Sequence, residues 1–464
     1  MSKGRKRMTI DAPADTPLPA ASANRLLTAP ILPTLIRLAI PNVIAMVGTA
    51  VVAVAETSYI GRLGTEPLAA IALVFPFAML TQMMSAGAMG GGVSSAVSRA
   101  LGAGDRTRAE VLALHAIIIG VCGGLVFTLI MLVFGRSLYS LLGGRGEVLE
   151  QACSYSVVLF SGAVSIWLVN TLASVLRGTG DMILPAATLL GVAALQIVIG
   201  GTFGLGLFGL PRLGMAGVAS GQLIAFSLGA VFLLLYMASG RGRLRLRVKS
   251  FAFQRVMFID ILKVGAMACL APLQSVLTIL IFTKILATFG TATLAGYGIG
   301  SRLEFLLIPI AFAFGVASIP MVGMAVGAGM IARARRVAWT AGAVSALIIG
   351  LVGVALAIQP SLWVSLFTSD PAVAAAAHSY FGWAGPGFAF FGLGVTLYFA
   401  SQGAAKVGGP VLAATARLLL VAVGGTALVA ADAPASALFA LVGAAMVVYG
   451  LGTAGAIRMT RWVK

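Results

Sequence analysis

An acidic residue, Glu56, lies within an otherwise apolar stretch of residues 41–64, PNVIAMVGTAVVAVAETSYIGRLG. Moving a carboxylate into hydrocarbon costs about 3 kcal/mol on insertion scales, so acids inside a membrane usually face a cavity or a partner. Such acids mark ion or substrate paths, and we therefore predict that Glu56 couples an ion to transport. The alternative is that Glu56 lies at a shallow depth, level with Arg62, and only solvates the end of a helix.

Pro41 opens the same stretch, fifteen residues before Glu56. Proline has no backbone N–H, so the carbonyl of Arg37 loses its helical donor and the helix can bend there. We predict a hinge at Pro41. The alternative is that Pro41 ends a helical turn at the membrane interface.

Hydrophobic residues make up 60% of the 464 residues, and charged residues only 9%. Soluble domains carry about 25% charged residues, so the composition is that of a polytopic membrane protein. Apolar windows long enough to cross about 30 Å of hydrocarbon as helices recur along the chain. They predict an all-α fold with twelve transmembrane helices, near residues 34–60, 67–98, 109–134, 149–176, 183–208, 214–238, 258–288, 293–326, 337–358, 373–402, 409–430 and 436–457.

The net charge of +18 is unevenly divided between alternate connections of these helices. One side has both tails, the pair Arg106 and Arg108, and the arginine-rich loop 240–256, whereas the other has only Arg62, Arg136, Arg145 and Arg212. By the positive-inside rule we expect both termini to be cytoplasmic, and we expect a multi-pass protein of the cell inner membrane. The charge thus indicates orientation and not nucleic-acid binding, although the loop could also bind anionic lipid.

An internal repeat divides the chain into two similar halves. The segment ALGAGDRTRAEV at 100–111 is echoed by AVGAGMIARARRV at 325–337, which places Gly102 on Gly327 at an offset of 225. RGTGDMILPAAT from Arg177 overlays QGAAKVGGPVLAAT from Gln402, and LGTEPLAAI at 63–71 overlays FGTATLAGY at 289–297. Each copy contains six of the twelve predicted spans. Because six is an even number, both copies have the same orientation in the membrane, and a pseudo-two-fold axis along the membrane normal relates them.

The repeat and the charge pattern together predict four regions. A disordered, basic cytoplasmic tail covers residues 1–29, and a basic cytoplasmic linker covers 240–256. The six-helix lobes between and after them span 30–239 and 257–464.

Several other polar residues lie inside the predicted spans. Asn170, Gln82 and Gln274 could line a cleft, or they could join helices through side-chain hydrogen bonds. Arg302 and Glu304 are two residues apart on a helix and so point in different directions. Glu304 therefore needs another partner, with Lys284 and Arg417 as the candidates in its lobe. One alternative is that Glu304 forms a structural ion pair with one of them. The other is that Glu304 is a second carboxylate that binds the coupling ion or the substrate.

Residues typical of enzymes do not occur in a usable pattern. Both histidines are isolated, the three cysteines fall in apolar spans, and we find no nucleophile triad, P-loop or metal-ligand spacing. The sequence therefore predicts no metal, no organic cofactor and no enzymatic activity. Three functions remain, namely an ion-coupled exporter, a flippase for a lipid-linked precursor, and a helical scaffold that transports nothing. A scaffold gives no reason for Glu56.

Over residues 30–457 the chain resembles the multidrug and toxic compound extrusion (MATE) family. The motifs that carry the resemblance are Pro41 followed by an acid and GRLG (61–64), LGAGD (101–105), RGTGD (177–181), PRLGMAGVASG (211–221) and GAG (327–329). The resemblance implies two six-helix lobes around a central cleft that opens alternately to either side. It also implies export of small amphipathic, often cationic, organic compounds against entry of protons or sodium ions. We expect the protein to act as a monomer in the lipid bilayer.

The resemblance also suggests site residues. The family's first-helix aspartate corresponds to Glu56, and its fifth-helix asparagine and aspartate correspond to Gln196 and Gly200. A seventh-helix carboxylate would fall near Gln274 or Ser275, where none is present. The chain thus resembles prokaryotic members whose coupling rests on the N-terminal lobe, and a single carboxylate among amides suits H⁺ better than Na⁺. The alternative function is a flippase, or an exporter of a lipid-linked or metabolite substrate in the same superfamily.

Overall fold

The computed structural model describes residues 25–246 and 253–462, which are almost wholly helical. The first half contains α2 (Ile31–Gly61), α3 (Thr65–Gln82), the π-helical turn η1 (Met83–Met89), α4 (Gly90–Gly102), α5 (Arg106–Leu141), α6 (Gly146–Ser161), α7 (Ala163–Gly178), α8 (Ile183–Leu205), η2 (Leu207–Gly209) and α9 (Gly214–Ala238). The second half contains α10 (Arg255–Ala268), α11 (Leu270–Ala287), α12 (Thr291–Gly327), α13 (Ile331–Ile358), α14 (Ser361–Val364), α15 (Pro371–Ala384), η4 (Gly385–Gly387), α16 (Phe388–Gly403), α17 (Gly408–Ala430) and α18 (Ala435–Met459).

The predicted number of membrane spans is confirmed. In the described part of the chain, eleven helical segments are long and apolar enough to cross a membrane. A twelfth is the pair α6 and α7, which passes the same test together and bends by 45° at Gly162. Helices predominate because hydrocarbon offers no hydrogen-bond partners, so each span must satisfy its own backbone N–H and C=O groups.

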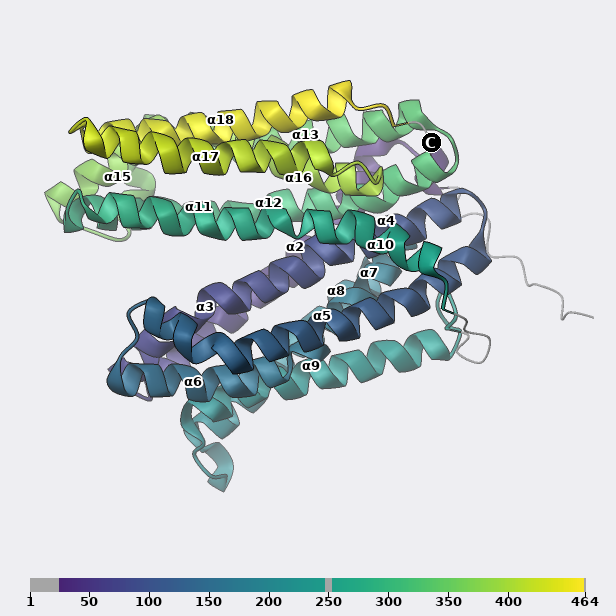
Figure 1. Ribbon diagram of the computed structural model, residues 1–464, viewed down its shortest axis with the longest axis horizontal. Helices are drawn as coiled ribbons and strands as arrows, with labels where there is room; N and C mark the ends of the chain where they lie inside the picture. The colour runs from purple at the N-terminus through teal and green to yellow at the C-terminus, as the bar shows by residue number, and fades with distance from the viewer. Residues whose placement is uncertain (1–24, 247–252, 463–464) are drawn as a thin grey trace, which may run out of the picture.

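The helices form two lobes, α2–α9 and α10–α18, which lie one above the other in Figure 1. The lobes are closest where α4 meets α10 and α12, and they diverge towards the end that carries α6 and α15. We call the end where they meet the basic end, because α4 finishes there beside Arg99 and the first turns of α5 and α13 carry Arg108 and Arg333.

The described residues begin and end at the basic end, where Leu26 meets Arg333 and Trp462 meets Arg335. Residues 1–24 of the predicted tail and 247–252 of the predicted linker lie outside the described residues. Residues 25–28 form a helical turn, although the sequence predicted disorder there, and Leu26 is buried. The difference arises because Leu26 packs in an apolar cluster with Met182 of the α7–α8 turn, and Arg333 donates hydrogen bonds to the Leu26 and Ala29 carbonyls.

The bends of the helices repeat like the sequence. The fourth span breaks at Gly162, between α6 and α7, and the tenth span breaks at Gly385–Gly387, between α15 and α16. Gly162 and Gly387 are related by the same offset that relates Gly102 to Gly327 in the loop motifs. The two halves therefore repeat in three dimensions as well as in sequence.

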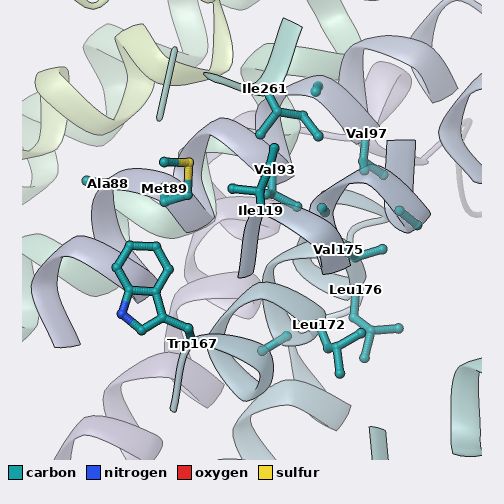
Figure 2. Close-up of a cluster of buried hydrophobic side chains, with 14 of the residues drawn as sticks. Ala88, Met89, Val93, Val97, Ile119, Trp167, Leu172, Val175, Leu176 and Ile261 are labelled. Carbon is teal, nitrogen blue, oxygen red and sulfur yellow. The ribbon is translucent and has the colours of Figure 1, made fainter. Parts of the chain in front are cut away.

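The main apolar core of the first lobe continues into the second. Figure 2 shows Met89, the last residue of η1, and Val93 of α4 near Ile119 of α5, with Trp167 of α7 on one side. Ile261 of α10, from the other lobe, belongs to the same cluster. The lobes are thus joined by buried apolar contacts at this end as well as by the linker.

Two glycines allow α4 and α12 to touch backbone to backbone on the pseudo-two-fold axis. A Cβ atom on Gly102 would lie 2.2 Å from the carbonyl oxygen of Met324, and one on Gly327 would lie 2.1 Å from that of Arg99. Arg99 and Met324 are also equivalent positions of the repeat. The two contacts are therefore related to each other by the pseudo-two-fold symmetry. Any side chain at either glycine must push the lobes apart.

We therefore expect Gly102→Ala and Gly327→Ala each to lower the unfolding free energy by about 1–3 kcal/mol, the usual cost of overpacking. The repeat predicts effects of similar size. Gly191→Ala on α8 is the control, since a Cβ there meets nothing within 4 Å. Thermal unfolding of the purified protein in detergent measures the effect. If both variants were as stable as Gly191→Ala, the close backbone contact between α4 and α12 would be contradicted.

Candidate functional site

Glu56 is buried inside the first lobe, with 8% of its surface exposed. It lies near the end of α2 that is far from the basic end, and α2 packs along α8. Its Oε1 accepts a hydrogen bond of 2.8 Å from Nε2 of Gln196 on α8. No basic side chain pairs with Glu56 among the described residues, so its one hydrogen-bond donor is neutral. This burial does not fit the alternative in which Glu56 only solvates the end of the helix.

The amide of Gln196 connects Glu56 to α9. Its Nε2 also lies 3.4 Å from Oε1 of Gln222. One turn away, α8 and α9 approach closely, because a Cβ on Gly221 would lie 2.5 Å from the backbone nitrogen of Gly200. Gly200, which the resemblance was expected to place at the family's second acidic position, serves this contact between two helices. Tyr155 of α6 is buried near enough to interact electrostatically with Glu56.

Asn170 and Gln82 join helices within the first lobe. Nδ2 of Asn170, on α7, donates to Oε1 of Gln82 at 2.9 Å and to Oγ of Ser85 at 2.8 Å. Ser85 belongs to the π-helical turn η1, whose wider winding interrupts the second span. Of the two roles open to these amides, the structure displays the bridging one.

Gln274 plays a similar part in the second lobe. Its Nε2 donates to Oγ1 of Thr415 at 2.7 Å and joins α11 to α17, while its Oε1 has no hydrogen-bond partner. It belongs to the other lobe and, within the described part of the chain, makes no hydrogen bond with Glu56, Gln196 or Gln222 of the first-lobe site.

Glu304 and Arg302 point in different directions, as their spacing predicted. Arg302 is exposed, and its guanidinium lies 5.2 Å from the centre of the Phe367 ring. Glu304 instead accepts a hydrogen bond from the hydroxyl of Tyr380 on α15. Of the two proposed partners, Lys284 is exposed and Arg417 faces Glu304 across a cavity.

This second-lobe cavity is small, with a volume of about 20 Å³. Its polar lining consists of Glu304, Arg417, Tyr297 and Thr278. Arg417 interacts electrostatically with Glu304 but makes no direct ion pair with it, and its guanidinium stacks near the rings of Phe391 and Tyr449. Of the two alternatives for Glu304, the direct ion pair with Lys284 or Arg417 does not form; a tyrosine hydrogen bond and a longer-range attraction to Arg417 take its place.

Pro41 lies inside α2, after ten helical residues. It does not end a helical turn, which was the alternative to a hinge. The next residue, Asn42, is buried and donates to the Leu38 carbonyl at 3.0 Å, and the same Nδ2 lies 3.5 Å from Sδ of Met182. The helix is thus held to the α7–α8 turn just beside the proline.

Sequence reasoning missed Tyr380, Ser85 and Thr415, which are ordinary residues of apolar spans. It also gave no role to Asp260, an acid in the first turns of α10 that pairs with two arginines of the first lobe. An isolated acid beside an apolar run was the available signal. Within the described residues, no three His, Cys, Asp or Glu side chains gather as metal ligands would.

Comparison with known proteins identifies the class. The MatE family model matches the chain twice, over residues 41–202 and 267–428, so that each match covers one copy of the repeat. Twelve spans in two repeated lobes, with a buried acid in the first helix, define a membrane transporter. The chain belongs to the MATE family, whose members are membrane exporters and not enzymes.

Curated relatives have different cargoes. The chain is 27% identical over 350 residues to the FAD transporter of Shewanella oneidensis, covering 75% of this chain and 77% of that one. It is 26% identical over 340 residues to the probable multidrug resistance protein NorM of Thermotoga maritima, covering 73% of each. The outward-facing structure of a multidrug resistance MATE transporter superposes with a TM-score of 0.84 at 23% identity, over 94% of this chain and 97% of that one.

The bond between Gln196 and Glu56 can be tested by a double-mutant cycle. Gln196→Leu should cost about 1–3 kcal/mol of unfolding free energy, because it leaves a buried carboxylate without a donor. Glu56→Leu combined with Gln196→Leu should cost less than the sum of the two single changes, by at least about 0.5 kcal/mol. Gln196→Leu combined with Gln274→Leu is the control and should be additive. Additive costs for Glu56 and Gln196, measured by denaturant titration in micelles, would show that they do not interact.

Proposed function

We propose that this protein is a proton-coupled antiporter that exports small organic compounds, with Glu56 as the coupling carboxylate. The observation that carries the proposal is the burial of Glu56 beside a single neutral donor, Gln196. A buried acid with no cationic partner gains by taking up a proton, because the neutral form can stay in an apolar site and the charged form needs water or more donors. Loading and releasing that proton on opposite sides would bias the lobes.

The geometry favours H⁺ over Na⁺ as the coupling ion. A sodium ion needs several oxygen ligands, whereas Gln196 offers Glu56 an N–H group. The amide would have to turn over before its oxygen could bind a cation. Gly200, at the family's second acidic position, supplies no side-chain oxygen.

We further infer that the basic end faces the cytoplasm, since arginines gather there from both lobes and from loop 240–246. In this orientation the lobes meet at the cytoplasmic end, and export requires them to rock so that the contact opens to load substrate. Both termini would then be cytoplasmic, and the cell inner membrane would hold the protein.

Two cargo classes follow from the relatives. Amphipathic, often cationic drugs are the first, by analogy with the relative named for multidrug resistance. A metabolite is the second, because the relative named FAD transporter matches the chain over a similar length. Resistance profiles of a drug-sensitive host, compared with flavin release by the same cells, separate these classes. Glu304 and Arg302 stay candidates for contact with the cargo, and the bridging amides Gln82, Asn170 and Gln274 do so as well.

Glu56→Gln should reduce gradient-driven efflux at least about tenfold while expression and substrate binding persist, because glutamine keeps the shape but carries no exchangeable charge. Efflux of a fluorescent cation from proteoliposomes, with and without a pH gradient, measures this. Glu66→Gln is the matched control, since Glu66 is exposed in the first turn of α3. Export by Glu56→Gln at the parent rate would remove Glu56 from the mechanism.

Pro41 is proposed as the hinge of α2. It lies about 22 Å from Glu56 along the helix, at 1.5 Å per residue, so a small bend there moves the Glu56 end by several ångströms. Proline leaves the Arg37 carbonyl without a donor, which makes such a bend cheap.

Pro41→Ala should therefore slow turnover about tenfold or more, with the protein still folded and still binding substrate. Transport and ligand-induced thermal shifts are measured on the same preparation. Pro309→Ala on α12 tests whether any intrahelical proline has the same effect. An unchanged transport rate in Pro41→Ala would mean that α2 does not bend there during the cycle.

A further inference from the structure

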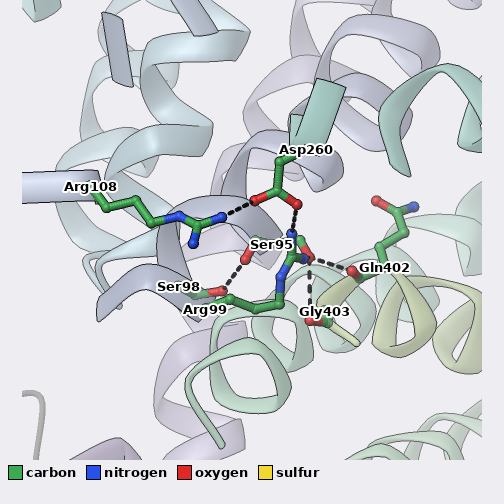
Figure 3. Close-up of polar contacts among 7 residues, drawn as sticks. All are labelled: Ser95, Ser98, Arg99, Arg108, Asp260, Gln402 and Gly403. Carbon is green, nitrogen blue, oxygen red and sulfur yellow. Dashed lines mark hydrogen bonds and ion pairs between the residues drawn. The ribbon is translucent and has the colours of Figure 1, made fainter. Parts of the chain in front are cut away.

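Three charged side chains join the two lobes at the basic end (Figure 3). Asp260 of α10 accepts from Nη2 of Arg99 on α4 at 2.7 Å and from Nη2 of Arg108 on α5 at 3.0 Å. Arg99 also bonds Ser95, whose hydroxyl reaches the carbonyl oxygen of Gln402 on α16. The side chains of Arg99 and Asp260 are 15% and 26% exposed, so this bridge is partly shielded from water.

A third arginine also joins the lobes, but here the arginine belongs to the second lobe and its acceptors belong to the first. Arg333, at the start of α13, donates to the carbonyl oxygens of Leu26 at 3.0 Å and Ala29 at 2.6 Å. These two carbonyls belong to the segment that leads into α2, the first helix of the first lobe. Here a second-lobe cation therefore holds first-lobe backbone.

The repeat relates these two contacts. Arg108 and Arg333 are equivalent positions of the repeat, and each is the third residue of its lobe's third spanning helix, α5 or α13. Each reaches across to the beginning of the other lobe's first spanning segment, which is α10 for Arg108 and the turn before α2 for Arg333. They flank the glycine crossing of α4 and α12. Backbone symmetry is kept, while the acceptor differs: a carboxylate in one case and two carbonyls in the other.

We propose that these contacts are two repeat-related arginine clasps, Arg108–Asp260 with Arg99, and Arg333–Leu26/Ala29, which hold the basic end shut and must both open in every transport cycle. The proposal rests on the alternating exposure proposed above. Hydrogen bonds that include a charged partner are stronger than neutral ones, so each clasp favours the closed arrangement. Because the lobes also touch through Gly102 and Gly327, rocking about that crossing would separate the clasps on both sides of it.

The two clasps call for different variants. Asp260→Asn removes the charge of the first clasp, and Asp260→Glu keeps it. Arg333→Gln weakens the second clasp without touching the first. The matched control is Glu150→Gln, which breaks the Arg136–Glu150 pair; both of its side chains are more than half exposed and both lie within the first lobe.

Distances between spin labels on the two lobes report whether the lobes are apart or together at each end of the molecule, and they need neither substrate nor an ion gradient. In a background with Cys122, Cys153 and Cys269 replaced by serine, one pair of labels is placed at Thr107→Cys and Ala332→Cys. These positions are exposed, repeat-related, and at the basic ends of α5 and α13. A second pair, Leu141→Cys and Ile358→Cys, marks the opposite ends of the same helices, where both side chains are at least 80% exposed.

We expect Asp260→Asn and Arg333→Gln each to raise the ratio of open to closed basic ends about tenfold, and the double variant to raise it by about the product. The 107–332 distance should lengthen as the 141–358 distance shortens. Asp260→Glu and Glu150→Gln should match the parent. Distance distributions of Asp260→Asn and Arg333→Gln that equal the parent's would overturn the proposal, as would an equal shift in Glu150→Gln. Because no transport is measured, these results stand apart from the outcome of Glu56→Gln.

Discussion

The backbone contact of α4 with α12 is the constraint around which the two lobes are arranged. Lipid tails are as apolar as leucine side chains, so helices in a membrane associate through close packing and polar contacts. Gly102 and Gly327 allow the backbones of α4 and α12 to meet without any side chain between them. Since the contact lies on the pseudo-two-fold axis, a glycine at the same position of each repeat fixes the distance between the lobes and their register. The clasps and the continuous core around Ile261 form around that fixed distance.

The repeat preserves the backbone but changes the chemistry inside each lobe. The position equivalent to Glu56, at an offset of 226, is Phe282. Phe282 lines the second-lobe cavity, where the carboxylate comes instead from Glu304 on α12 and faces Arg417. The first lobe thus holds an acid with a neutral amide, and the second holds an acid with a tyrosine and a nearby cation. A fold with two similar lobes can in this way give each lobe a different response to protons and to charged compounds.

The first helix connects these features. α2 begins beside the carbonyls that Arg333 binds, passes Pro41 and the anchoring side chain of Asn42, and carries Glu56 towards its far end. A change at Glu56 and a change at the basic end would therefore act on the same helix, on either side of its proline. α2 is one helix across Pro41, where the missing N–H removes only the backbone hydrogen bond to the Arg37 carbonyl, so a displacement at one end can reach the other through the proposed hinge.

The sequence alone determined the number of spans, the repeat, and Glu56 with Gln196 as residues worth testing. These follow from hydrophobicity over about twenty residues, from matching motifs, and from a rare charge in an apolar run, all of which are properties of the linear chain. It also separated Arg302 from Glu304, since side-chain directions two residues apart on a helix are set by local geometry.

Only the tertiary structure decided which side chains meet. Tyr380 as the partner of Glu304, Asp260 between Arg99 and Arg108, and the ordering of Leu26 under Arg333 each join segments far apart in the chain. Such pairs depend on how each helix is rotated about its own axis and on where it crosses its neighbours. Uniformly apolar spans leave that rotation almost unmarked in the sequence, so it is set by the packing of small residues between helices.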